Sequence, residues 1–338
     1  MSTEASPRIA TFRRYGAKLE ITPLTLAEPK PKQLVIKVHS VSLNPIDFKR
    51  RDGATKLLIH DDFPAGICFD VAGFVEKVGS EVSEFKVGQR VCARSKHSGT
   101  LADFCIVDQD VTAHLPDNVS FVDAAALPLA GQTALQALRH GGLKEGDTIF
   151  ISGGAGGVGS YALQLAKHVF KARKVVTSCS ESKIEFCKSL GADECIDYHK
   201  SNPYKAPDEP YDMVFDTVGD ARKMGGKMIK PGRSVVSVAA LPEPGAFDRI
   251  GMSIPLPLRL VLHVASVREK WGASPGTYQY VFLKPTSQDL TELVGYLSSG
   301  TLRSCIDSEF DGIEKSNEAF DRIETGRAKG KVIINVRK

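Results

Sequence analysis

The fold of this chain is decided by the stretch Thr148-Ile149-Phe150-Ile151-Ser152-Gly153-Gly154-Ala155-Gly156-Gly157-Val158-Gly159. Its apolar first half predicts a strand, and Gly154-x-Gly156-x-x-Gly159 fits the fingerprint of dinucleotide-binding turns. Glycine permits a sharp turn and a close approach to a pyrophosphate, while the start of the next helix supplies N–H groups and a positive dipole end. Apolar residues then recur at helical spacing as far as Val169. A purely structural glycine turn is the alternative, but the flanking strand and helix favour a dinucleotide site made by Gly154, Gly156, Gly157, Val158 and Gly159.

The composition is that of a water-soluble globular protein and argues against several other classes. Of the 338 residues, 42% are hydrophobic and 25% are charged, and the net charge of +4 comes from no long basic block. We therefore expect neither nucleic-acid nor membrane partners. The longest apolar run, residues 254–267, is broken by prolines and charged residues and is too short to span a bilayer. The seven cysteines form no C-x-x-C pair, which indicates reduced thiols and therefore a cytoplasmic location. Residues 1–10 carry no cleavage signature of a signal peptide, which agrees with that location.

Two patterns along the chain divide it into domains. Residues 9–115 show short alternating segments punctuated by glycine and proline, which predicts a barrel-like β domain. From residue 148 onward strands and helices alternate, which is typical of a parallel sheet covered on both faces. The last elements are expected to return to the first domain. We therefore predict an α/β protein with a β-rich domain of residues 1–124 and 286–338, and a nucleotide-binding domain of residues 125–285.

Some segments carry less regular patterns. Residues 123–137 predict a helix interrupted at Pro128 and Gly131, and residues 222–229 predict a short helix. Residues 278–283 predict the last strand of the parallel sheet. Residues 241–274 have an apolar middle among prolines and glycines, and three roles stay open for them: a lid, an oligomer contact or ordinary core.

The end of the strand predicted over residues 174–178 indicates which dinucleotide binds. In NAD-binding folds a carboxylate at this point binds the 2′-hydroxyl of the ribose. Here Ser178 and Ser180 stand at the strand end and Lys183 follows, so hydroxyl and ammonium groups are available to a 2′-phosphate. Glu181 opposes this interpretation unless it points outward, and Ser180 can also cap a helix. The pattern favours NADPH as the cofactor.

Ordered motifs give the chain a family resemblance. They are residues 42–49 (SLNPIDFK), 70–75 (DVAGFV), 127–134 (LPLAGQTA), the glycine turn, 189–193 (SLGAD) and 330–332 (GKV). Together they resemble the zinc-free branch of the medium-chain dehydrogenase/reductase superfamily, which contains zeta-crystallin-like NADPH:quinone oxidoreductases and the related enone or 2-alkenal reductases. The resemblance covers about residues 9–336 and implies a GroES-like β-rich catalytic domain joined to a Rossmann doubly wound domain that binds NADPH.

The resemblance also implies that no metal takes part. Alignment with zinc-dependent members places Asn44, Phe69 and Leu129 where those proteins hold their catalytic zinc, and neither phenylalanine nor leucine can ligate a metal. Without zinc to stabilise an alkoxide, reduction of an electron-poor acceptor is favoured over oxidation of an alcohol. Quinones and α,β-unsaturated carbonyls are such acceptors, so we expect hydride transfer to them from NADPH.

Two other functions stay open. One is a trans-acting enoyl reductase of a polyketide or fatty-acyl pathway. The other is a non-catalytic NADPH-binding protein, like relatives that serve as crystallins or bind RNA. The aromatic content of 7%, without a tract of interleaved basic and aromatic residues, argues against RNA binding.

Several residues match positions that the family uses for catalysis or for the nicotinamide. Asn44 matches a polar residue near the nicotinamide, with an Asn-Pro turn as the alternative. Thr133 matches a threonine on the nicotinamide side, or is an ordinary helix hydroxyl. Lys49 stands where similar bacterial reductases often have a tyrosine. It is therefore a candidate oxyanion partner or proton donor, and otherwise a solvated surface lysine.

Three further residues are candidate cofactor contacts. Tyr198 matches a tyrosine near the adenosine phosphate, and Arg327 matches a basic residue near the cofactor; the alternatives are a strand-end aromatic and a helix-end charge. Phe282 is either core or a wall of the nicotinamide site. By analogy with dimeric relatives we expect a homodimer joined through the strand of residues 278–283, and a small quinone or enone as substrate.

Overall fold

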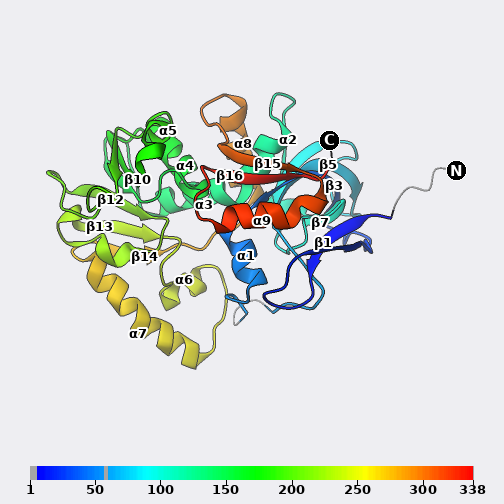
Figure 1. Ribbon diagram of the computed structural model, residues 1–338, viewed down its shortest axis with the longest axis horizontal. Coiled ribbons are helices and arrows are strands. Elements are labelled where there is room, and N and C mark those ends of the chain that lie inside the picture. The colour runs from blue at the N-terminus through cyan, green and yellow to red at the C-terminus, as the bar shows by residue number, and fades with distance from the viewer. Residues whose placement is uncertain (1–5, 57–59, 338) are drawn as a thin grey trace. The chain divides into compact units, whose positions relative to one another are not determined.

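The chain forms two compact units in the structure, a computed structural model that describes residues 6–56 and 60–337 (Figure 1). Unit 1 consists of Met1–Gln132 with Pro285–Lys338, and unit 2 consists of Thr133–Lys284. None of the helices in the described ranges is long and apolar enough to cross a membrane.

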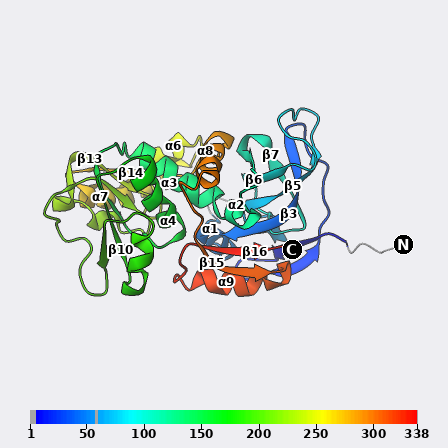
Figure 2. The ribbon, with the colours of Figure 1, turned by 90° about the horizontal axis from the view of Figure 1, so that it is seen from above.

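Unit 1 is built around a seven-stranded sheet with the order β15-β16-β3-β5-β6-β8, in which β7 also pairs with β3. The long strand β3 has two partners along one edge: its residues 33–37 pair with β7, and its residues 40–43 pair with β16. Strands from the two ends of the chain therefore lie side by side, as both ribbon views show (Figures 1 and 2). The strands are β3 (Gln33–Leu43), β5 (Asp70–Val78), β6 (Arg90–Arg94), β7 (Phe104–Asp108), β8 (Thr112–His114), β15 (Ile306–Asp311) and β16 (Lys331–Asn335).

A second, three-stranded sheet and short helices complete unit 1. Its core is apolar and includes Leu34, Ile36 and Val38 of β3, which are fully buried. Their alternation with Val35, Lys37 and His39 predicts a half-buried strand, but Val35 is fully buried as well. The small sheet has the order β2-β1-β4. These elements are β1 (Arg8–Phe12), β2 (Glu20–Pro23), β4 (Ala65–Gly66), α1 (Pro45–Arg51), α2 (Phe121–Ala126), α8 (Ser287–Ser298) and α9 (Ser316–Glu324), and α3 (Pro128–His140) runs from unit 1 into unit 2.

Unit 2 contains a six-stranded parallel sheet with the order β11-β10-β9-β12-β13-β14. The chain runs outward from β9 in one direction and then restarts beside β9 in the other, which is the doubly wound order that the alternating pattern predicts. The predicted fold class is therefore confirmed for this unit. Its elements are β9 (Thr148–Ile151), α4 (Gly157–Gln164), β10 (Lys174–Cys179), α5 (Ile184–Lys188), β11 (Glu194–Asp197), β12 (Tyr211–Asp216), β13 (Ile229–Ser237), α6 (Pro244–Arg249), α7 (Leu256–Ala273) and β14 (Thr277–Tyr280).

The helix predicted over residues 123–137 is two helices, α2 and α3, with the break where Pro128 begins α3. Proline suits the first turn of a helix because that position needs no N–H donor. The break predicted at Gly131 is wrong. There a β-carbon would lie 2.8 Å from Cδ1 of Leu127, so this glycine serves close packing within a continuous helix.

Two other segments differ from the sequence prediction. Residues 222–229 form no α-helix but two short 3₁₀ turns, Ala221–Lys223 and Gly226–Met228, with Gly225 between them. Residues 241–274 contain α6 and the long helix α7, which prolines near its start conceal from a periodicity analysis.

Candidate functional site

The glycine turn after β9 is packed too closely to accept a side chain at Gly154 or Gly159. A β-carbon on Gly154 would lie 2.3 Å from Oγ1 of Thr177, and one on Gly159 would lie 2.3 Å from the carbonyl oxygen of Gly153. Gly153 itself has a φ of +63°, which only glycine adopts readily. The turn is therefore shaped by glycine at these positions.

Neighbouring hydroxyl groups hold the turn in place. The N–H of Gly154 donates to Oγ1 of Thr177 at 3.0 Å, and the N–H of Gly153 donates to Oγ of Ser178 at 3.2 Å. Helix α4 starts at Gly157, and the first N–H groups of a helix have no acceptor within the helix. Gly156, Gly157, Val158 and Gly159 thus present a helix start suited to a pyrophosphate. Ser178, predicted as a cofactor contact, supports this turn directly.

The ends of β10 and β11 bring three more polar residues to one edge of the sheet. Cys179 of β10 pairs with Asp197 of β11, so the segments that follow the two strands are neighbours. Ser180 and Lys183 follow β10, while Tyr198, which is 51% exposed, follows β11. These are the residues predicted to surround the adenosine phosphate.

Lys200 lies at the same edge and was missed by the sequence analysis. Its ammonium group makes an ion pair with the carboxylate of Glu181, and this hydrogen bond raises the pKa of Lys200. Glu181, the residue that argued against NADPH, is therefore already paired with a cation. The available signal was the position of Lys200, in the turn after β11, a strand that parallel topology places beside β10.

Thr133 and Phe282 are the other predicted cofactor residues of unit 2. Thr133 is buried near the start of α3, at 6% exposure. The ring of Phe282 packs against Phe247 and Tyr280, with ring centres 4.9 and 4.7 Å apart. Phe282 also lines a small cavity of about 140 Å³ together with residues of α3 and α6. Its role as core is visible in these contacts, whereas its role at the nicotinamide stays a prediction.

In unit 1 a buried carboxylate gathers donors from several elements. Asp70 of β5 accepts hydrogen bonds from Oγ of Ser42 at 3.0 Å, from Nδ2 of Asn44 at 2.8 Å and from the N–H of Leu129 at 3.0 Å. Nζ of Lys331, on β16, lies 3.7 Å from this carboxylate and also donates to Oδ1 of Asn44. The carboxamide of Asn44 is thereby held at both ends.

Burial shifts the acid–base properties of this cluster. Removal from water raises the pKa of Asp70 and lowers that of Lys331, and the attraction between the two charges opposes both shifts. Burial also raises the pKa of Asp47 to about 7, although the N–H of Asn44 donates to its Oδ2 at 2.7 Å. Oδ1 of Asp47 has no hydrogen-bond partner among the described residues. This cluster therefore holds a carboxyl group that titrates near neutral pH.

The three predicted residues of unit 1 differ in their surroundings. Asn44 is 2% exposed and directly precedes Pro45, the first residue of α1. It therefore stands at an Asn-Pro helix start, as the alternative interpretation expects, and is at the same time a buried polar residue. Lys49 is exposed on α1, where its carbonyl oxygen accepts from the N–H of Ala54, and its ammonium group makes no hydrogen bond or ion pair with the described residues. Arg327 is exposed in the turn between α9 and β16. Lys49 and Arg327 are thus accessible cations, whereas Asn44 is fixed.

The residues aligned with zinc ligands have other roles here. The ring of Phe69 lies under the guanidinium groups of Arg94 and Arg50, at 4.7 and 5.9 Å from the ring centre. Leu129 contributes its N–H to Asp70, and Asn44 is held by Asp70 and Lys331. Within the described ranges no three His, Cys, Asp or Glu residues are grouped so that they could hold a metal ion.

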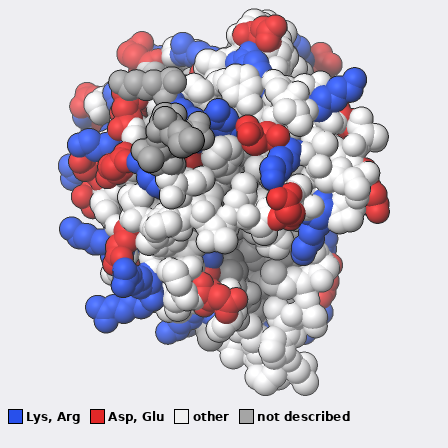
Figure 3. All heavy atoms as spheres, turned by 90° about the vertical axis from the view of Figure 1, so that its right-hand side faces the viewer, with Lys and Arg blue, Asp and Glu red and all other residues white. Residues whose placement is uncertain are grey.

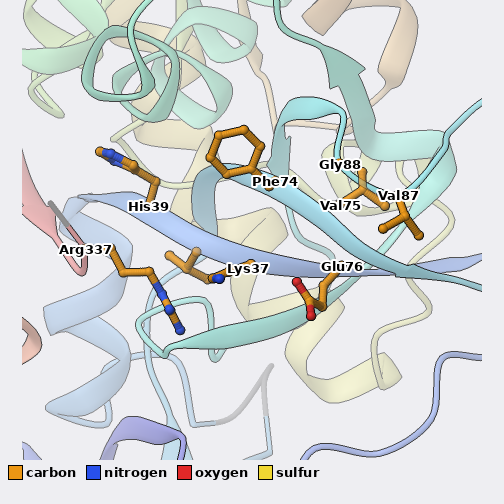
Figure 4. Close-up of a pocket in the computed structure, with 9 residues that line it drawn as sticks. Lys37, His39, Phe74, Val75, Glu76, Val87, Gly88 and Arg337 are labelled. Carbon is orange, nitrogen blue, oxygen red and sulfur yellow. The ribbon is translucent and has the colours of Figure 1, made fainter. Parts of the chain in front are cut away.

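A separate hollow of about 470 Å³ lies on unit 1 and contains none of the predicted site residues (Figure 4). In the close-up, Lys37 and His39 project from β3, with Phe74 on the neighbouring strand β5.

Basic and acidic side chains are intermixed on the face drawn in Figure 3, which agrees with the small net charge.

The raised pKa of Asp47 predicts a pH-dependent stability. Between about pH 4 and 7 the folded protein keeps this carboxyl protonated while the unfolded chain ionises it, so the free energy of unfolding should fall as the pH rises. The span from the ordinary 3.8 to about 7 corresponds to at most about 4 kcal/mol. Asp47→Asn should remove this slope in urea unfolding at pH 4.5 and 7.5. The exposed Asp62→Asn is the control, and an unchanged slope in Asp47→Asn would contradict the assignment.

Comparison with known proteins agrees with both units. The family model described as alcohol dehydrogenase GroES-like domain matches residues 30–117, and the model described as zinc-binding dehydrogenase matches residues 190–334. The chain is 38% identical over 338 residues to the 2-methylene-furan-3-one reductase of Solanum lycopersicum, covering 96% of this chain and 78% of that protein. It is 35% identical to the NADPH-dependent alkenal/one oxidoreductase of Arabidopsis thaliana, with the same coverage of each chain.

A solved structure gives the same result for the fold. The quinone oxidoreductase from Coxiella burnetii is 31% identical, with a TM-score of 0.80 over 98% of this chain and 99% of that one. The GroES-like prediction for the β-rich domain is confirmed by these matches. This chain belongs to the medium-chain dehydrogenase/reductase superfamily, in the branch of the quinone oxidoreductases and alkenal/one oxidoreductases.

Proposed function

We propose that this protein is an NADPH-dependent reductase that transfers hydride to α,β-unsaturated carbonyls or quinones without a metal ion. One observation carries the choice of cofactor: the segments that follow β10 and β11 offer hydroxyl and ammonium groups, and Glu181, the acidic residue that follows β10, is paired with Lys200. A 2′-phosphate therefore meets cations there instead of an uncompensated carboxylate.

The residues present fit a dinucleotide. Added β-carbons at Gly154 and Gly159 would collide with neighbouring atoms, which is typical of a turn that a pyrophosphate approaches closely. Bound NADPH supplies the hydride. The helix start at Gly156 to Gly159 would hold its pyrophosphate, and Thr133, Asn44 and Phe282 its nicotinamide. The adenosine phosphate would be held by Ser180, Lys183, Tyr198 and Lys200, and Arg327 stays a predicted contact of the cofactor.

The acceptor class is favoured by the relatives. Two of them, at 38% and 35% identity, are named as a reductase of a 2-methylene-furan-3-one and as an alkenal/one oxidoreductase. Both names describe carbon–carbon double bonds conjugated to a carbonyl. A quinone oxidoreductase from Triphysaria versicolor is 31% identical. We therefore place alkenals and enones first among the acceptors and quinones second.

The residues of unit 1 would act on the acceptor. Reduction at the β-carbon leaves negative charge on the carbonyl oxygen, which a positioned donor stabilises. Lys49 is an exposed ammonium group that can donate to this oxygen, and Asn44 is a carboxamide fixed by Asp70 and Lys331. We assign Lys49 the role of oxyanion partner or proton donor, and Asn44 that of positioning the nicotinamide.

The charge distribution and the cysteines bear on the partners and the compartment of this protein. We propose a small-molecule substrate, without a nucleic acid or membrane partner, because basic and acidic side chains are intermixed on the face drawn in Figure 3. None of the seven cysteines, all in the described ranges, forms a disulfide, which suits a reducing compartment such as the cytoplasm.

An absorbance assay tests the reaction. Oxidation of NADPH should proceed with short 2-alkenals and enones, more slowly with 1,4-quinones, and in the presence of EDTA. Lys49→Met should lower kcat about 10- to 100-fold, as expected for loss of one oxyanion donor or proton donor. Lys56→Met, on the segment that follows α1, is the matched control. Tight NADPH binding without turnover of any acceptor would instead support a non-catalytic protein, and turnover of acyl-carrier-bound enoyl chains alone would support a trans-acting enoyl reductase.

The assignment of the phosphate site is tested by charge reversal. Lys183→Glu and Lys200→Glu should each weaken NADPH about 10- to 100-fold and leave NADH nearly unchanged, since only NADPH carries the phosphate that they contact. Lys188→Glu, the same change later on α5, should affect neither. Equal losses for the two cofactors, measured by isothermal titration, would refute the assignment.

We also propose a homodimer that uses an edge of the sheet and an apolar helix face. Strand β14 ends the sheet and pairs on one side with β13, so its other backbone groups can pair with a second copy. Helix α7 exposes an apolar row at helical spacing: Leu256, Leu260 and Val264 are 59–70% exposed and Trp271 is 79% exposed.

Light scattering tests the dimer. The wild-type protein should have the mass of two chains, and the double substitution Leu260→Glu with Val264→Glu should shift it to one chain because two carboxylates cannot be buried unpaired. Lys270→Glu, on another face of α7, is the control. A wild-type mass of one chain at micromolar concentration would overturn the proposal.

A further inference from the structure

Three cysteine thiols of unit 2 lie together and form what we call the thiol cluster: Cys179 at the end of β10, Cys187 in α5 and Cys195 in β11. The three side chains are close enough for each thiol to affect the pKa of the other two. The backbone explains the proximity, because Cys195 lies opposite Thr177 in the β10–β11 ladder and Cys179 follows two residues later on the same face. Helix α5 packs on both strands and brings Cys187 to them.

The three thiols differ in their access to solvent. Cys179 is 3% exposed and Cys187 is fully buried, whereas Cys195 is partly exposed. The thiol of Cys195 also donates weakly to the carbonyl oxygen of Ile184, at 3.7 Å. A small oxidant from solvent therefore reaches Cys195 first.

The hydrogen bonds also favour Cys195 as the reactive group. Hydrogen bonds with Cys179 and Cys187 lower the pKa of Cys195, and the charge of Lys188 adds to this effect. The hydrogen bond with Cys179 raises the pKa of Cys187. The most accessible sulfur of the cluster is thus also the one whose pKa is lowered, which favours the nucleophilic thiolate form at Cys195 over its two neighbours.

We propose that the thiol cluster is a site of reversible oxidation, at which a peroxide converts Cys195 and one neighbouring thiol into a disulfide. The Cys195 thiolate attacks one peroxide oxygen, the O–O bond breaks, and a sulfenic acid and one water result after proton transfer. Cys179 or Cys187 then attacks that sulfur, forms the S–S bond and releases a second water. Two thiols are oxidised, one peroxide is reduced to two waters, and a dithiol reverses the change.

The position of the cluster gives the oxidation a consequence that rests on the proposed function. Cys179 stands between Ser178, whose hydroxyl accepts from the glycine turn, and Ser180, which we place near the 2′-phosphate. A disulfide at this point requires the sulfur atoms to move from contact to bonding distance, which displaces the end of β10. Oxidation should therefore weaken NADPH binding.

The other cysteines provide an internal comparison. Cys68, Cys92 and Cys105 of unit 1 are buried, and burial raises the pKa of each thiol. Without access or thiolate character they should react slowly with peroxide.

Peptide mapping of the full-length protein tests the oxidation. After brief treatment with a small excess of hydrogen peroxide and alkylation, mass spectrometry should find a disulfide that joins the Cys195 peptide to that of Cys179 or Cys187, and dithiothreitol should reverse it. Cys195→Ser and Cys195→Ala should each abolish it, whereas Cys105→Ala should not. In Cys179→Ala with Cys187→Ala, dimedone should trap the sulfenic acid on Cys195. Absence of a Cys195 disulfide in the wild type, or equal oxidation of all seven cysteines, would overturn the proposal.

A binding measurement separates this proposal from the proposed function. Oxidised wild-type protein should bind NADPH about 10-fold more weakly than reduced protein, and peroxide should not change binding by Cys195→Ser. Disulfide formation with unchanged affinity would refute the coupling to the nucleotide. Failure of the reduced wild type to bind NADPH would refute the proposed function while leaving the mapped disulfide intact.

Discussion

The β-rich unit depends on one buried carboxylate. Asp70 accepts hydrogen bonds from β3, from the residue that begins α1 and from the start of α3, and it faces the ammonium group of Lys331 on β16. A buried charge that loses its partner costs about 3–5 kcal/mol, so these elements cannot separate without a large penalty. Because Lys331 comes from the end of the chain, the ion pair ties the C-terminal strand to the N-terminal half of this unit.

The same two charged residues, Asp70 and Lys331, also hold the carboxamide of Asn44. In zinc-dependent members the aligned positions hold a metal, whereas here Phe69 and Leu129 bring an aromatic ring and a backbone N–H, and Asn44 is held by neighbours of opposite charge. The cation beside Asn44 and Asp70 in this chain is the ammonium group of Lys331. Comparison with relatives adds the likeness to quinone and alkenal/one oxidoreductases at 31–38% identity.

How far the sequence predicts this structure depends on the range of the interaction. The glycine turn and strand β3 are local patterns, and both form where predicted, although Val35 is buried together with the alternating residues Leu34, Ile36 and Val38. The pairing of Glu181 with Lys200 depends on two strands that become neighbours only in the folded sheet. The contact between Asn44 and Lys331 joins opposite ends of the chain.

Helix α7 escaped prediction for a different reason. Pro255 and Pro257 break the pattern at its start, and several apolar residues of its row face solvent instead of the core, so periodicity gives no buried stripe to recognise. The roles of Lys49, Arg327 and Thr133 depend on a bound ligand and stay predictions.

The exposed end of α7 has a practical consequence for spectroscopy. The chain contains a single tryptophan, Trp271, and its side chain is 79% exposed. The indole emission of this protein therefore reports the polarity around one helix surface and is nearly silent about the β-rich unit. Changes in that emission during a titration or a thermal scan would describe α7 and whatever covers it, so following unfolding of the remainder calls for a probe of the backbone, such as circular dichroism.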